Sequence, residues 1–145
     1  MSMILEDIIE INASPERVWQ VTVDVVAWPQ WSPAMEKIRR EDTGEFKQGS
    51  TALIKQKQMP ETRWTVTAID PGQRFTWQAR ALGMEMIATH SIVPGDGAVT
   101  SLLRIEMKGL LITLLGPIMK MLVRKSLKEE NQGLKHYCES GPEDN

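Results

Sequence analysis

The segment from Leu110 to Glu139 constrains the fold most, because it is the only stretch long and periodic enough to form a major helix. Its first half, up to Val123, is apolar at almost every position; the exceptions are Thr113, Gly116, Pro117 and Lys120. From Arg124 onward the apolar residues form one helical stripe, which consists of Leu127, Leu134, Tyr137 and Cys138. The second half is therefore expected to bury one face, whereas the first half needs cover on most sides.

A membrane role for this helix has to be weighed. A transmembrane helix needs about 20 consecutive apolar residues, and the apolar run here is shorter and is interrupted, so we expect no integral membrane segment. Lys120, Arg124 and Lys128 recur at four-residue spacing, as in helices that lie on a membrane surface. We favour the simpler interpretation that they form the solvated face of a helix packed on a sheet. Pro117 predicts a kink or a restart of the helix.

Length and charge set further bounds. The chain of 145 residues suits one domain, expected over residues 1–140, with a short flexible tail at 141–145. Its formal net charge of −2 and the lack of a basic stripe argue against nucleic acid as a partner. Cys138 is the single cysteine, so no intramolecular disulfide can form. The beginning of the sequence does not resemble a secretory signal, and a cytoplasmic location is the expectation.

Upstream of the helix, the pattern predicts mostly strands. A strand over 3–11 is followed by a helix that Ser14 caps and Pro15 begins, and then by a short, turn-like helix around Trp28–Pro33. From there the period changes to two, and tight turns such as Asp70–Gly72 separate the segments. The predicted strands cover residues 36–41, 50–58, 62–69, 74–82, 84–93 and 98–108.

These elements predict an α+β fold in which a seven-stranded, curved antiparallel sheet wraps around the long C-terminal helix, with two short helices after the first strand. One face of such a sheet is apolar and must be covered, and the terminal helix is the only segment large enough to cover it. A strongly curved sheet around a single helix tends to leave a cavity between the two.

The opening of the chain resembles a known family. The runs INASPERVW and DVVAWPQWSP are similar to the start of the polyketide cyclase/dehydrase family, within the START-like superfamily that includes the birch-pollen allergens. Further similarities are WTVTAIDPGQRFTW, the lone His90 followed by a strand, and GLK with Glu139 in the last helix. The resemblance covers nearly the whole chain. It implies a helix-grip fold with a deep apolar cavity for lipids, sterols, polyketides or plant hormones, and it carries over no catalytic residue.

Motifs for other chemistry are missing from the sequence. It contains no GxGxxG, no P-loop and no His/Cys cluster at metal spacing, so no cofactor and no metal are expected. His90 and His136 are the only histidines. Strand parity points His90 into the cavity, as an acid–base or hydrogen-bonding group, although we favour a structural histidine satisfied by its neighbours. Arg40 and Gln56 are either polar groups inside the cavity or, after a bulge, groups turned to solvent.

Strand parity and helical spacing select the candidate ligand-binding residues. In the helix, Leu111, Leu115, Ile118 and Leu122 recur at intervals of four, three and four, so they are expected to face the sheet. Methionines suit an adaptable pocket, although each one alone is more simply a filler of gaps in the core. The full predicted set is Trp64, Phe75, Trp77, Met84, Met86, His90, Met107, Leu111, Leu115, Ile118, Met119 and Leu122.

Three functions are compatible with this pattern. The first is a carrier or sensor that binds a small hydrophobic molecule, acting as a monomer or weak homodimer. The second is a cyclase- or dehydratase-type enzyme that acts on a polyketide-like substrate. The third is a protein-interaction module, which a filled cavity and an exposed apolar patch would favour. Inward polar groups that converge on one point would favour the enzyme over the carrier.

Overall fold

The computed structural model describes residues 2–140, and the predicted tail at 141–145 lies outside them. Within these residues the chain forms seven strands, two α-helices and one 3₁₀ helix. In chain order these are β1 (Ser2–Ile11), α1 (Pro15–Val23), η1 (Val25–Gln30), β2 (Met35–Arg40), β3 (Thr51–Gln56), β4 (Thr62–Asp70), β5 (Arg74–Ala81), β6 (Met84–Pro94), β7 (Val99–Gly109) and α2 (Leu110–Ser140). Every predicted element is present.

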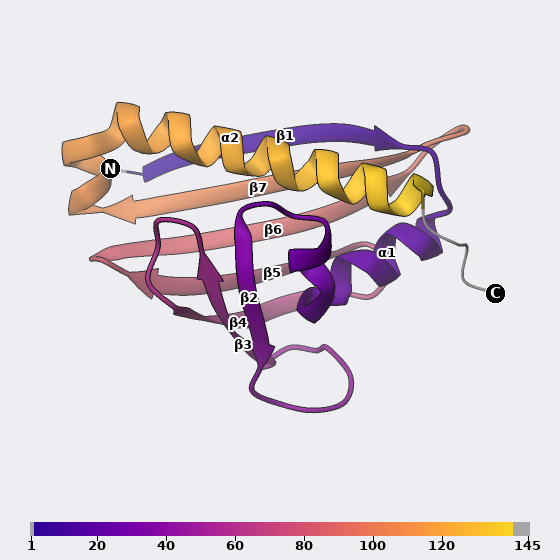
Figure 1. The fold of residues 1–145 in the computed structure, drawn as a ribbon, viewed down its shortest axis with the longest axis horizontal. Helices are drawn as coiled ribbons and strands as arrows, with labels where there is room; N and C mark the ends of the chain where they lie inside the picture. Colours follow the sequence, from indigo (N-terminus) through magenta and orange to yellow (C-terminus); the bar gives the residue numbers. More distant parts are fainter. Residues whose placement is uncertain (1, 141–145) are drawn as a thin grey trace.

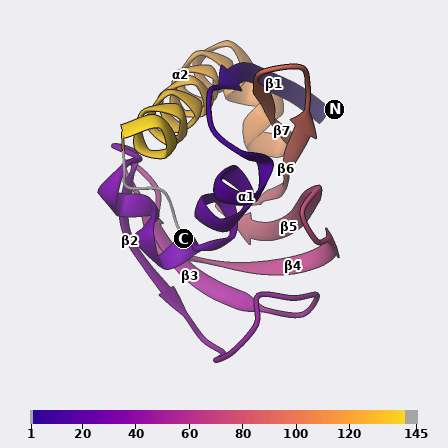
Figure 2. The ribbon, with the colours of Figure 1, turned by 90° about the vertical axis from the view of Figure 1, so that its right-hand side faces the viewer.

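The seven strands form one antiparallel sheet in the order β1-β7-β6-β5-β4-β3-β2. The loop 41–50 connects β2 to β3, and shorter turns connect the strands from β3 to β7. β1 pairs with β7 over its whole length, from Ser2↔Lys108 to Ile11↔Val99. The sheet curves around α2, which runs along β1 and β7 (Figures 1 and 2). This arrangement confirms the predicted helix-grip fold.

The first helix, α1, has the predicted cap. The Ser14 hydroxyl accepts a hydrogen bond from the backbone N–H of Arg17 at 3.1 Å, and Pro15 occupies the first turn. Viewed from the end of the sheet where α1 lies, this helix sits inside the arc formed by the strands and α2 (Figure 2). Together with η1, which packs on β2, α1 therefore closes that end of the fold.

The C-terminal half of α2 is tied to the rest of the fold by polar contacts. The side chain of Asn131 is fully buried; its amide donates to the Asp7 carboxylate at 2.8 Å and accepts from the Ser101 hydroxyl at 2.8 Å. One turn later, Lys135 donates to the backbone carbonyl of Glu10 at 2.8 Å, and Glu139 accepts from the Asn12 backbone N–H at 2.7 Å. These bonds fix the register of the helix against β1 and β7.

The N-terminal half of α2 is different. Leu115 has non-helical backbone angles (φ −120°, ψ 22°), and Pro117 follows, so the predicted kink is present. Several apolar side chains here are exposed to solvent: Leu110, Leu114, Leu115, Ile118, Met121 and Leu122. No helix within residues 2–140 has the length and hydropathy needed to cross a membrane.

The kink corrects the predicted orientation of two side chains. Leu115 and Ile118 were expected to face the sheet, but they are 41% and 54% exposed. The expectation assumed one uninterrupted helix, whereas the irregular residue Leu115 rotates the face presented by the following turns. Ile112 before the kink is 3% exposed and takes the buried position instead.

A bulge changes which residues of β4 face the core. Strict alternation places Ala68 on the same face as Trp64 and Val66, but the register against β5 shifts between Val66 and Ala68. Such a bulge reverses which residues face inward. Ala68 is accordingly exposed, and Ile69 packs against the core.

Gly133 generates a sharp prediction about the docking of α2. A Cβ atom at this position would overlap with the backbone carbonyl oxygen of Trp31, just after η1, whereas a Cβ at Gly116 in the same helix meets nothing within 4 Å. Gly133→Ala should therefore destabilise the fold by about 2 kcal/mol or more, although alanine favours a helix by roughly 1 kcal/mol. Gly116→Ala, the matched control, should be neutral or stabilising by up to about 1 kcal/mol. Urea unfolding midpoints measure both, and equal effects would contradict the close helix–backbone contact.

Candidate ligand-binding cavity

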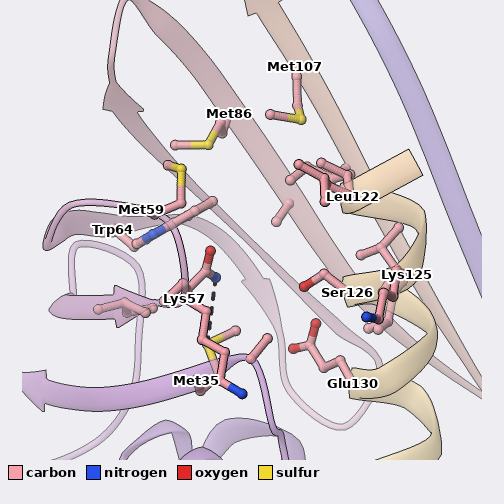
Figure 3. A pocket seen from close by; sticks show the side chains of 18 of the residues that line it. Met35, Lys57, Met59, Trp64, Met86, Met107, Leu122, Lys125, Ser126 and Glu130 are labelled. Carbon is pink, nitrogen blue, oxygen red and sulfur yellow. Dashed lines mark hydrogen bonds between the residues drawn. The ribbon is translucent and has the colours of Figure 1, made fainter. Parts of the chain in front are cut away.

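A cavity of about 370 Å³ lies between the sheet and α2. Its walls are contributed by η1, by strands β2 to β7 and by the part of α2 from Leu111 to Glu130. Six of the nine methionines in the chain line it: Met35, Met59, Met84, Met86, Met107 and Met119. Figure 3 shows Met59, Met86 and Met107 on the sheet side of the space and Leu122 across from them on α2. The greater part of the wall is apolar.

Nine of the twelve predicted ligand-binding residues line this cavity: Trp64, Trp77, Met84, Met86, His90, Met107, Leu111, Met119 and Leu122. The other three do not. Phe75 is fully buried behind the wall, and Leu115 and Ile118 are on the exposed side of α2. Sequence reasoning did not propose Met35 and Met59. Met35 begins β2 but precedes the strand predicted at 36–41, and Met59 lies in the connection between β3 and β4, so periodicity assigned neither of them to a face. Whether the nine contact a ligand stays a prediction.

His90 belongs to an aromatic cluster at the wall. Its ring stacks on Phe75, with centroids 4.6 Å apart and planes 11° from parallel, and its centroid lies 5.1 Å from that of Trp28. Burial lowers the pKa of His90 to about 3, since a charged imidazolium would lose its hydration among these rings. The imidazole is therefore neutral at physiological pH. The Trp28 indole N–H donates to the backbone carbonyl of Thr22 at 3.1 Å, which anchors η1 to α1.

Glu130 is the functional candidate that sequence reasoning missed. The residue is only 7% exposed, it lines the cavity, and its Oε1 atom is buried without a hydrogen-bond partner. Burial raises the pKa of Glu130 to about 8, so the carboxyl group is protonated at neutral pH. Glu130 belongs to the run KEEN at residues 128–131, and such a charged and polar run is typical of a solvent-exposed helix face. The signal that identifies it is spacing, because Glu130 falls three residues after Leu127 and four before Leu134, on the buried stripe.

Other polar groups occupy the rim or lie elsewhere. Lys57, Arg104, Lys125 and Glu129 border the cavity, and Lys125 pairs with Glu129 at 3.9 Å. Gln56 lines the cavity and donates to the Met35 sulfur at 3.6 Å (dashed in Figure 3). Arg40, the other predicted polar group, does not line the cavity; it binds the Asp42 carboxylate at 3.0 Å and the Gly44 carbonyl at 2.8 Å.

Two further groups bear on chemistry. Cys138 is buried outside the cavity wall, and burial raises the pKa of its thiol to about 11, so it is not a reactive thiolate at neutral pH. Among residues 2–140, no three or more His, Cys, Asp or Glu side chains are placed to hold a metal ion together.

Comparisons with known proteins agree with this architecture. The model of a protein family described as "Polyketide cyclase / dehydrase and lipid transport" matches residues 4–139. A START superfamily protein from Mycobacterium smegmatis has a similar structure, with a TM-score of 0.80 at 18% identity, covering 94% of this chain and 97% of that one. The Zhui aromatase/cyclase from Streptomyces sp. R1128 matches with a TM-score of 0.81 at 15% identity, over 96% and 94% of the two chains. No curated protein matches by sequence. At these identities the structural matches establish the fold alone.

The burial of Glu130 predicts how stability depends on pH. Its carboxyl group titrates near 4.5 in an unfolded chain and at about 8 in the folded protein. Between these values the folded state keeps a proton that the unfolded state releases, so the free energy of unfolding falls as pH rises, by up to about 1.4 kcal/mol per pH unit. Glutamine does not titrate, so Glu130→Gln removes this fall in the free energy of unfolding. The variant should therefore gain stability relative to the natural protein, by a few kcal/mol, between about pH 5 and pH 8.

Urea unfolding across this pH range, with Glu129→Gln as the matched control, tests the prediction. The Glu129 side chain is 34% exposed and paired with Lys125, so its replacement removes the same formal charge from an accessible site. Parallel stability curves for the natural protein and Glu130→Gln would show that Glu130 is not buried as described.

Proposed function

The chain belongs to the polyketide cyclase/dehydrase and lipid-transport family, and from that premise we propose that it binds a small hydrophobic molecule between the sheet and α2, as a carrier or sensor. The observation that carries the proposal is the cavity of about 370 Å³ with its largely apolar wall. Cavities that hold small molecules measure roughly 300–1,000 Å³ and are mostly apolar with a few polar groups. The space suits a body the size of a short lipid chain or a few fused rings.

The composition of the wall supports an adaptable site. Methionine side chains are unbranched and polarisable, and six of them surround the space, so the wall can fit ligands of different shape. Trp64 and Trp77, whose ring centroids are 5.6 Å apart, add flat surfaces for rings or chains. At neutral pH the two titratable groups that are deeply buried in the wall, His90 and Glu130, are both uncharged. An uncharged, pliable wall favours an apolar ligand.

An enzyme of the cyclase or dehydratase kind is the second candidate, because two titratable groups, His90 on β6 and Glu130 on α2, line the same cavity. Its support is weaker on chemical grounds. A general acid or base works best with a pKa near the operating pH. Glu130, with a pKa of about 8, meets this condition, but His90, with a pKa of about 3, is too weak a base at pH 7, so the two do not form a matched acid–base pair. Arg40, which would have completed a polar cluster, is engaged elsewhere with Asp42. The carrier or sensor is therefore the function that the geometry supports best.

Filling the cavity tests the proposal. Ala88 on β6 lines the space, so Ala88→Trp should occupy it and weaken the binding of an environment-sensitive apolar dye by about tenfold or more, since ligand and indole then compete for one volume. Ala68 on β4 is exposed and outside the wall, and Ala68→Trp is the matched control that should leave affinity unchanged. Fluorescence titration gives the affinity and the expected stoichiometry of about one dye per chain.

Medium-chain fatty acids or polycyclic aromatics should displace the dye from the natural protein and from Ala68→Trp, and they should bind Ala88→Trp more weakly. Dye binding could survive in Ala88→Trp but disappear when the exposed apolar residues Leu114, Ile118 and Met121 of α2 are made polar. Such a result would place the apolar site outside the cavity. That result would favour the protein-interaction function.

A further inference from the structure

The wall of the cavity has two chemically different regions. Along α2 the first part of the wall is apolar and consists of Leu111, Met119, Leu122 and Val123. The second part is mostly polar and consists of Lys125, Ser126, Leu127, Glu129 and Glu130. Ser126 and Glu130 are four residues apart, so they lie on the same face of the helix. Figure 3 shows both side chains extending from α2 into the space, away from Met59, Met86 and Met107 and across from Met35. The cavity therefore has an apolar region and one polar corner.

The polar corner contains an atom whose hydrogen bonding is not satisfied by the described residues of the protein. Oε1 of Glu130 is buried and has no hydrogen-bond partner, and no ion pair joins Glu130 to Lys57, Arg104, Lys125 or any other residue in the described range 2–140. Buried polar atoms are nearly always hydrogen-bonded, and an unpartnered one calls for an explanation such as a ligand. The next residue makes the contrast clear, because the buried amide of Asn131 is satisfied by Asp7 and Ser101. The same helix turn thus satisfies one buried polar side chain internally and directs the other into the cavity.

We propose that Glu130, with Ser126 beside it, is the polar anchor of this cavity, and that its ligand is an apolar molecule carrying one uncharged hydrogen-bonding group, such as a hydroxyl or a carbonyl. The inference rests on the proposed function and adds the chemical class of the ligand. A carboxyl and a hydroxyl side chain both donate and accept hydrogen bonds, so they match a group of either kind. A ligand carboxylate would bring a second acidic group against Glu130, which has no cation paired with it, and such a ligand is disfavoured.

A matched series of probes on one aromatic body tests this assignment. Naphthalene, 2-naphthol and 2-naphthoate share the two-ring body and differ in the group that would meet Glu130. Calorimetric titrations at about pH 6 compare the natural protein with Glu130→Gln, which keeps an uncharged hydrogen-bonding side chain, and Glu130→Met, which keeps the length without it. Glu16→Gln, an exposed position in the first turn of α1, controls for the loss of charge.

The quantity that decides is the affinity for 2-naphthol relative to naphthalene. Glu130→Met should lower this ratio by about tenfold, the usual worth of a buried hydrogen bond, while Glu130→Gln and Glu16→Gln should keep it. Naphthalene itself should bind all four proteins alike, and 2-naphthoate should bind the natural protein more weakly than 2-naphthol.

Other outcomes overturn the inference in distinguishable ways. An unchanged ratio in Glu130→Met, with all probes still bound, would remove Glu130 as the anchor and leave the proposed function standing. Tightest binding of 2-naphthoate would overturn the choice of an uncharged group. Failure of every probe to bind the natural protein would overturn the proposed function and this inference together.

Discussion

The close docking of the C-terminal half of α2 is the constraint on which the rest of the structure depends. Gly133 lets the helix approach the backbone at Trp31, and Asn131 locks it to β1 and β7 through Asp7 and Ser101. Because this half is fixed, the sheet can curve around the helix without collapsing onto its whole length. The N-terminal half, bent at Leu115, packs less closely and leaves several apolar side chains exposed. The cavity lies beside the part of α2 from Leu111 to Glu130, which precedes the fixed residues Asn131 and Gly133.

The same constraint accounts for the chemistry of the cavity. A helix held in one register presents a fixed set of side chains to the sheet, and Glu130 is included because it directly precedes the locked residue Asn131. Its burial is costly for stability, and Gly133 and the Asn131 contacts keep the helix from rotating to relieve it. Under the proposed function, the partner of this carboxyl group would be a hydrogen-bonding group of the ligand. The methionines opposite supply an apolar wall with no fixed shape.

Much of the fold follows from local patterns in the sequence. Alternation and the turn residues around Asp70–Gly72 and Pro94–Gly97 set the strand limits to within a residue or two, because these signals depend only on neighbours in the chain. The bulge after Val66 and the rotation of α2 beyond Leu115 were not predictable in this way, because tertiary packing decides them. The same limit explains the candidate site. The alternation of strand residues identified Met86 and His90, but Glu130, a charged residue in a polar run, was not among the predicted site residues.

The proposed function requires an apolar ligand to lie inside the cavity and not on the exposed apolar residues of α2, such as Leu114, Ile118 and Met121. The methionines offer a direct measurement, because six of them line the cavity while Met121 on α2 is 66% exposed. Methyl-¹³C methionine NMR spectra recorded with and without naphthalene report where its ring current acts. If the ligand binds in the cavity, the signals of Met86, Met107 and their neighbours in the wall should shift in a saturable way, and the Met121 signal should not move. Shifts confined to Met121 would place the ligand on the outer surface and contradict the proposed function.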